Sequence, residues 1–144
     1  MVAQMLERLG WDQVFHRIRI GPGKAVGFGL LEEKPVFILP GGPPSNLMGF
    51  LQIALPGLMK LSGRLQAGLP VAKARLASDL TGRHADWTQF VFGVLETQKE
   101  MPLFHPIRKS SRLRSMAEAQ AIAAIPEGKT HLPAGTVISA QVLT

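Results

Sequence analysis

The feature that most constrains the fold is a change in the spacing of apolar residues between residues 62 and 70. Before this segment, helical and extended patterns alternate; after it, the chain consists mainly of short extended runs separated by turns. Mixed strands and helices indicate an α/β layer structure, whereas closely spaced short strands are typical of a small barrel or a two-layer β domain. We therefore predict a partial α/β domain in residues 1–64 and a separate small β domain in residues 70–144.

The first portion is predicted to run in the order helix, strand, hairpin, buried strand, glycine turn and helix. Helical spacing of apolar residues covers residues 2–9, and residues 14–20 alternate as a strand does. The apolar run at residues 36–39 predicts a strand covered on both faces. Ser45 stands where a helix N-cap is expected, and the spacing over residues 47–61 predicts a largely buried helix that its proline kinks or restarts.

The second portion is predicted to be mostly strand, with one short helix. Gly and Pro separate its apolar runs, as expected for tight connections between short strands. The expected strands lie in residues 71–78, 88–97, 102–107, 121–125 and 136–143, and the expected helix lies in residues 115–121.

Charge and composition narrow the range of functions. The 144 residues include 16 Lys and Arg against 10 Asp and Glu, which gives a net charge of +6 and favours an anionic partner. The chain has no cysteine, which excludes disulfides and thiolate metal sites, and its histidines lack the spacing of metal ligands. Charges at Glu7 and Arg8 interrupt the opening segment, and no apolar run is long enough for a membrane span. We therefore expect a cytoplasmic protein.

Two turns in the first portion are candidate anion-binding elements. In PVFILPGGPPSN, a strand leads through Gly41 and Gly42 into a helix, so backbone N–H groups and the hydroxyl of Ser45 could face an anion. In GPGK, the preceding turn fixes the chain just before Lys24, whose ammonium group could hold an oxyanion. Each turn alone also fits a purely structural connection, and the chain lacks the GxxxxGK[ST] and GxGxxG phosphate motifs.

A third candidate is the basic run RKSSRLR, residues 108–114, before the predicted helix of the second portion. Its cations and hydroxyls suit a phosphate, a pyrophosphate or a nucleic-acid backbone. A solvated basic loop is the equally simple alternative.

Residues 14–63 and the segments that follow resemble the C-terminal part of the molybdopterin molybdenumtransferase (MoeA/gephyrin E-domain) family. GPGK corresponds to the family's K-P-G-K-P turn, and LPGGPPSN corresponds to its G-L-P-G-N-P-x-S-A turn. Downstream, KSS corresponds to Q-G-S-G, SMAEAQA to the short S-L-A-x-A-N-G helix, and PEG and LPAG occur as in the family. The segments are collinear over nearly the whole chain.

The resemblance implies the fold of the C-terminal part of a three-layer α/β, molybdopterin-binding-like domain, followed by a small β-barrel-like domain. It implies insertion of molybdate into adenylated molybdopterin, with Mg²⁺, in molybdenum cofactor biosynthesis. The residues that it places against a molybdopterin-type ligand are Lys24, Gly41, Gly42, Ser45, Lys109, Ser110 and Arg112.

The chain also departs from the family pattern. Gly21 replaces the first lysine of the family turn, and Gly42 replaces its asparagine. The chain begins after the S-G-G-V-S turn and the acidic residues that bind Mg²⁺ in the family, so no Mg²⁺ ligands are visible and catalytic residues are not assigned. We therefore expect a truncated or diverged relative that is inactive alone. An upstream domain or a separate chain would complete its site, and the protein could form a homodimer. The alternative is a non-catalytic scaffold or a basic polyanion-binding protein, although the absence of Tyr does not favour nucleic acid.

Overall fold

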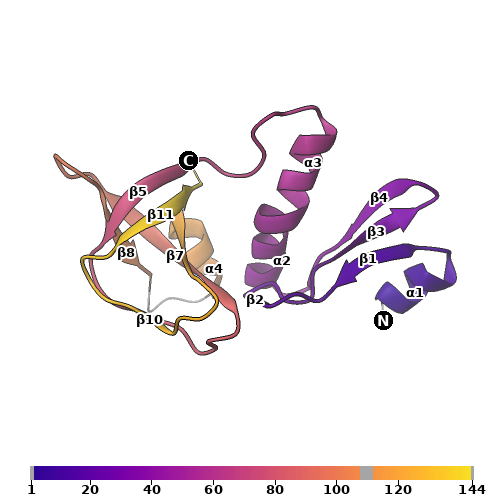
Figure 1. Cartoon of the computed structure of the whole chain (residues 1–144), viewed down its shortest axis with the longest axis horizontal. Helices are drawn as coiled ribbons and strands as arrows, with labels where there is room; N and C mark the ends of the chain where they lie inside the picture. Colours follow the sequence, from indigo (N-terminus) through magenta and orange to yellow (C-terminus); the bar gives the residue numbers. More distant parts are fainter. Residues whose placement is uncertain (1, 108–111, 144) are drawn as a thin grey trace. The chain divides into compact units, whose positions relative to one another are not determined.

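The computed structural model describes residues 2–107 and 112–143. The chain divides into two compact units, Met1–Gly68 and Leu69–Thr144. The first is an α/β unit and the second is a small β-barrel, so the predicted fold class is confirmed (Figure 1).

The first unit contains a three-stranded antiparallel sheet in the order β1-β3-β4. A turn at Glu32 and Glu33, both with positive φ, joins β3 to β4 and forms the predicted hairpin. The elements of this unit are α1 (Val2–Arg8), β1 (Asp12–His16), β2 (Ile20–Gly21), β3 (Gly27–Leu31), β4 (Lys34–Ile38), α2 (Pro43–Gly49), a π-helical turn η1 (Phe50–Ala54) and α3 (Leu55–Leu61).

Helices cover both faces of this sheet. Successive residues of β4 point to opposite faces, so this one strand contacts the helices on both sides. On one face, Ile38 joins Ala3 of α1 and Trp11 in a small core. On the other face, Phe37 lies against α3, where a Cβ on Gly57 would be 2.6 Å from the Phe37 ring. The result is the α/β/α layering that was predicted.

Aromatic side chains cross the sheet on the face that carries α3. Phe15, Phe28 and Phe37 stand opposite one another in register on the three strands. Their ring centroids are 6.1 Å apart for Phe15–Phe28 and 4.9 Å apart for Phe28–Phe37, distances at which aromatic pairs stabilise a sheet. This row connects all three strands to each other.

Several local predictions for the first unit were wrong. The strand expected at residues 14–20 ends at His16, because Arg17 adopts a left-handed conformation with φ 67°. In α1, Ala3 is the buried residue, whereas Val2, Met5 and Leu9 of the predicted apolar face are exposed.

The segment from β4 to α3 is also less buried than its sequence predicts. In β4 only Ile38 is buried, because β4 is an edge strand of the sheet. Leu58 and Leu61 of α3 are exposed, and no residue of α3 is buried. A new helix does begin at Leu55, and the widened turn of η1 precedes it because Pro56 cannot donate a helical hydrogen bond.

The second unit is a closed five-stranded barrel in the order β7-β8-β5-β11-β9, with β9 pairing back to β7. All neighbouring strands are antiparallel except β5 and β8, which are parallel. The elements are β5 (Val71–Leu76), β6 (Leu80–Thr81), β7 (Thr88–Glu96), β8 (Leu103–Pro106), α4 (Arg112–Glu118), β9 (Ala121–Ile125), β10 (His131–Leu132) and β11 (Val137–Val142).

Small and large apolar side chains fill the barrel interior. Phe104 is fully buried and lies among Leu76, Ile125 and small residues such as Ala123 and Ala140. All the long strands predicted for this unit are present, whereas the short β6–β10 pair has no counterpart in the prediction. The helix lies earlier than expected, because the Gln120 amide donates to Gly93 O at 2.9 Å and draws the chain into β9.

Candidate functional site

The turn at residues 21–24 is held by backbone hydrogen bonds between its two arms. The Ile18 amide donates to Lys24 O at 2.9 Å, and the Arg17 amide donates to Val26 O at 2.9 Å. Gly23 has φ +114°, a conformation that residues with a side chain rarely adopt. These constraints fix the backbone immediately before Lys24, whose side chain is exposed.

This turn packs directly against the first turns of α2. A Cβ on Gly23 would lie 3.4 Å from Ser45 O and 3.3 Å from the Gly49 amide nitrogen. Glycine is therefore required here both by its φ and by the approach of the helix. The contact brings Lys24 and Ser45, which are far apart in sequence, into the same part of the first unit.

The turn between β4 and α2 has a different internal structure from the one predicted. Gly42 is the N-cap, with φ −73° and ψ 131°, and no side chain caps the helix. Ser45 lies inside the first turn of α2, so the prediction that it is the N-cap was wrong. Asn46 braces this turn instead: its amide donates to Gly42 O at 2.8 Å, and its side chain donates to Pro40 O at 2.9 Å.

The glycine backbone of this turn is open to its surroundings. Gly41 and Gly42 are exposed, and a Cβ on either would have no atom of the described chain within 4 Å. Neither residue has a positive φ, so local geometry does not require glycine at either position. Pro43 and Pro44 carry no N–H, so few helix N-terminal donors face outward.

Arg17 is a neighbour of this site that the sequence did not single out. It is exposed, it precedes the turn that carries Lys24, and it is one of the non-glycine residues with positive φ. Such conformations often accompany functional sites. A left-handed arginine has no sequence signature, so only the structure could draw attention to it.

The charge of this region is positive. Residues 17–24 contain Arg17, Arg19 and Lys24, and neither that segment nor residues 40–49 contain a carboxylate or a histidine. The arrangement can therefore attract an oxyanion and offer it a hydroxyl and backbone N–H groups. Within these two segments there is no side chain suited to general acid–base chemistry, so they form a binding element.

The third predicted element lies mostly outside the described residues. Lys109 and Ser110 are not among them, and Arg112 is the first residue of α4 in the second unit. Among the described residues there is no group of three or more His, Asp or Glu placed to hold a metal ion, and the two turns contain no carboxylate that could bind Mg²⁺. In the same part of the chain, none of the helices has the length and apolar character needed to cross a membrane.

Histidines form two exposed pairs with carboxylates on the barrel. Asp79 accepts a hydrogen bond from the Ala134 amide at 2.8 Å, and its other carboxylate oxygen lies 2.9 Å from His131 Nε2. These contacts join the segment before β6 to the segment around β10. His105 Nε2 lies 2.7 Å from Glu96 Oε2 on adjacent strands. Both pairs join neighbouring segments and have a structural role.

Comparisons with known families, sequences and structures agree with one another. Residues 73–143 match the model of the MoeA C-terminal region (domain IV). The molybdopterin molybdenumtransferase of Synechococcus elongatus is 28% identical over 144 residues, and the match covers 99% of this chain and 34% of that protein. Molybdopterin molybdenumtransferase 2 of Mycobacterium tuberculosis is 29% identical over 130 residues, with 90% of this chain and 32% of that protein covered.

A solved structure shows the same similarity in three dimensions. The molybdopterin biosynthesis MoeA protein of Pyrococcus horikoshii superposes with a TM-score of 0.81 at 30% identity, covering 99% of this chain and 34% of that one. The chain therefore spans about a third of the length of the relatives that it matches.

Proposed function

Because this chain belongs to the MoeA family and corresponds to its C-terminal part, we propose that it acts in molybdenum cofactor biosynthesis by binding adenylated molybdopterin. The ligand-binding element is the pair of turns in the first unit. The observation that carries the proposal is the packing of Gly23 against Ser45, which joins the two turns into one surface.

Each residue of this surface has a role that follows from its chemistry. Lys24 supplies a positive charge to a phosphate oxygen, and Arg17, which precedes the same turn, supplies a second cation. Ser45 offers a hydroxyl, and the open backbone at Gly41 and Gly42 allows a phosphate to approach closely. The family resemblance additionally assigns Lys109, Ser110 and Arg112 to the ligand.

We assign pterin binding to this chain and the remaining steps of the reaction to other protein segments. The proposed reaction of molybdenum cofactor biosynthesis is the insertion of molybdate into adenylated molybdopterin, so molybdate is the second substrate. The two turns contain no carboxylate for Mg²⁺, so we assign the binding of that ion to an upstream domain or a partner chain. A partner chain could be a second copy of this protein in a homodimer. This chain alone is therefore expected to bind the pterin without converting it.

Isothermal titration with adenylated molybdopterin and with molybdopterin tests this proposal. Lys24→Gln should weaken binding by about 1.5–3 kcal/mol, the range for a hydrogen bond to a charged group. Lys34→Gln is the matched control, because Lys34 is an exposed lysine at the distant end of the β3–β4 hairpin. Absence of binding, or equal losses in the two variants, would refute the proposed site.

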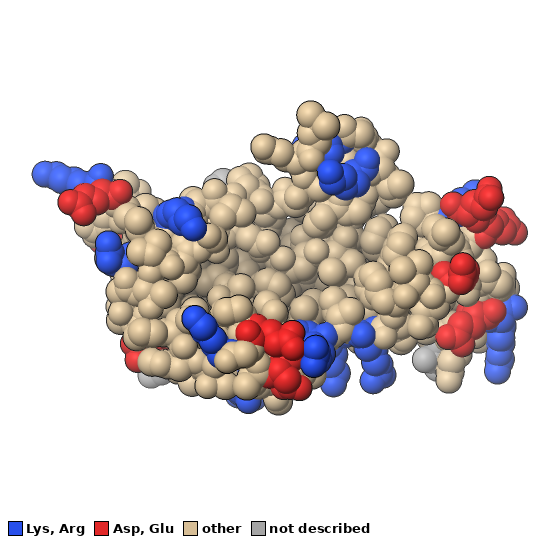
Figure 2. Space-filling model, viewed as in Figure 1, with Lys and Arg blue, Asp and Glu red and all other residues tan. Residues whose placement is uncertain are grey.

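The alternative of general polyanion binding has a separate signature. On the face shown in Figure 2, basic side chains are interspersed with carboxylates instead of forming one continuous patch. A polyanion binder should bind RNA with an affinity that falls steeply and linearly with salt on logarithmic axes. Such binding without any preference for molybdopterin would favour this alternative.

A further inference from the structure

The outer surface of the barrel contains a hollow that the proposed function does not use. Its volume is about 460 Å³, within the range of roughly 300–1,000 Å³ that is usual for small-molecule sites. It lies between β5 and the loop of the β7–β8 hairpin, and its lining residues are Arg75, Gln98, Lys99, Glu100, Met101 and Leu103.

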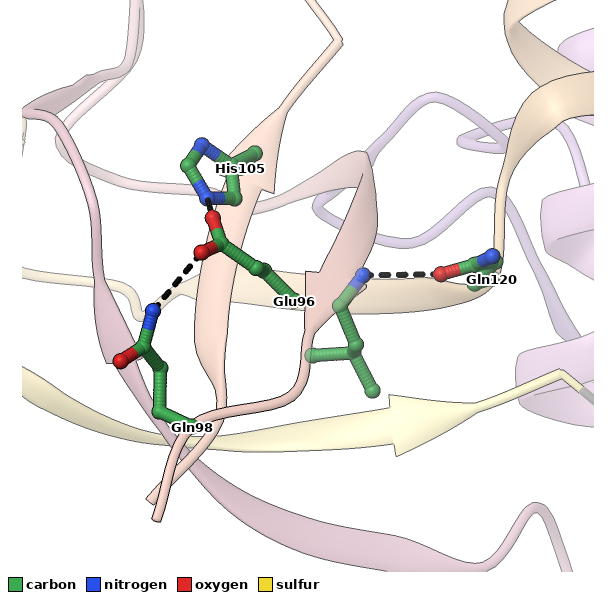
Figure 3. Close-up of polar contacts among 5 residues, drawn as sticks. Glu96, Gln98, His105 and Gln120 are labelled. Atoms are coloured by element: carbon green, nitrogen blue, oxygen red, sulfur yellow. Dashed lines mark hydrogen bonds and ion pairs between the residues drawn. The ribbon is translucent and has the colours of Figure 1, made fainter. Parts of the chain in front are cut away.

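The backbone around this hollow is well tied together. Arg75 pairs with Leu103 where β5 and β8 run parallel, and the Arg75 amide donates to Pro102 O at 2.9 Å. Closer to the barrel, Glu96 accepts from Gln98 at 2.7 Å and contacts His105 at 2.7 Å, which links the two arms of the hairpin (Figure 3). The hairpin is thus fixed to β5 at its base.

The lining has two chemical parts. Arg75 and Lys99 contribute two positive charges and Glu100 one negative charge, so the local balance is positive. Arg75 Nη1 makes a long contact of 3.4 Å to Gly135 O, which leaves most of the five guanidinium donors for a ligand. Met101 and Leu103 are half-buried and supply an apolar wall.

We infer that this hollow binds a small organic anion, with its carboxylate or phosphate head on Arg75 and Lys99 and its apolar body against Met101 and Leu103. The planar guanidinium can hold either head group through two parallel hydrogen bonds. The proposal is one of reversible binding and includes no covalent step. The inference is independent of the pterin site, because no residue that lines the hollow is assigned to that site.

Titrations of the whole ¹⁵N-labelled chain followed by NMR test this inference. Phenyl phosphate and benzoate are the two anionic probes, inorganic phosphate tests the head group alone, and benzyl alcohol tests the apolar body alone. Both anionic probes are expected to shift the amide signals of residues 98–101, of Leu103 and of Gly135. Inorganic phosphate and benzyl alcohol should each bind at least tenfold more weakly than phenyl phosphate.

Two variants on one strand separate a specific site from general attraction of anions. Arg75→Gln should weaken phenyl phosphate binding at least tenfold. Lys73→Gln should change it less than twofold, because Lys73 is also exposed on β5 but contacts Ser139 and does not line the hollow. Equal losses in the two variants, shifts spread over the whole surface, or no shifts at millimolar probe would overturn the inference.

Discussion

Gly93 of β7 allows the largest buried side chain of the barrel to reach its place. A Cβ at this position would overlap the Phe104 ring, with Cε2 only 2.6 Å away, and would lie 2.7 Å from His105 O. Phe104 is fully buried among other core side chains, so a shift of its ring would press on its neighbours. The backbone of β8 is held by its pairing with β7.

Gly93→Ala should therefore destabilise the barrel by about 3 kcal/mol, the upper end of the usual cost of overpacking. Both a ring and a backbone carbonyl would have to move, which is why the upper end applies. Phe104→Leu alone should cost about 1.5 kcal/mol through the lost ring contacts. In the double variant the smaller leucine relieves one of the two clashes. Its destabilisation should be at least about 1 kcal/mol below the sum of the single changes.

Urea unfolding followed by the fluorescence of Trp87 measures these values. Trp87 lies in the second unit just before β7 and contacts His84 with ring centroids 5.0 Å apart, so unfolding should change its emission. A Trp11→Phe background removes the signal of the first unit, where the second tryptophan lies. A loss below about 0.5 kcal/mol for Gly93→Ala, or strict additivity in the double variant, would refute this account of the core.

Three further changes test other parts of the structure by urea unfolding. Asp79→Ala should cost about 1 kcal/mol, because it removes both an acceptor for a loop amide and the exposed contact with His131; an unchanged midpoint would contradict this. Gly29→Ala should cost about 1–3 kcal/mol in the first unit, since its Cβ would overlap the backbone oxygen of Asp12 and lie 2.6 Å from Trp11 Nε1; a neutral result would contradict this. Ser45→Ala should change stability by less than about 0.5 kcal/mol, whereas a loss near 1 kcal/mol would mean that the serine caps the helix after all.

The order and type of the main elements could be predicted from the sequence because each has a strong local pattern. The apolar run of β7, the alternating residues of β11 and the glycine turns between strands identify the barrel strands without reference to contacts distant in sequence. Positions that depend on tertiary contacts were less predictable. Arg17 ends β1 by adopting a left-handed conformation, which no neighbouring residue signals.

The candidate site shows the same division between local and tertiary information. The turns around Lys24 and Ser45 were visible as motifs, but their contact depends on how closely Gly23 approaches α2. The N-cap was predicted wrongly because Pro43 and Pro44 can occupy the first helical positions, which moves the helix start ahead of Ser45. The exposure of the apolar residues of α3 likewise depends on which segments pack around this helix. The spacing of apolar residues along the sequence does not specify those segments.

The position of β11 has a consequence for how the protein is synthesised. This last strand pairs with β5, the first strand of the barrel, on one side and with β9 on the other. During translation, β5 and β9 must therefore remain unpaired along these edges until β11 has left the ribosome. Because such long-range pairing folds slowly and exposes strand edges, the barrel can close only after β11 has been synthesised. Loss of β11 would leave nascent chains as substrates for chaperones and proteases.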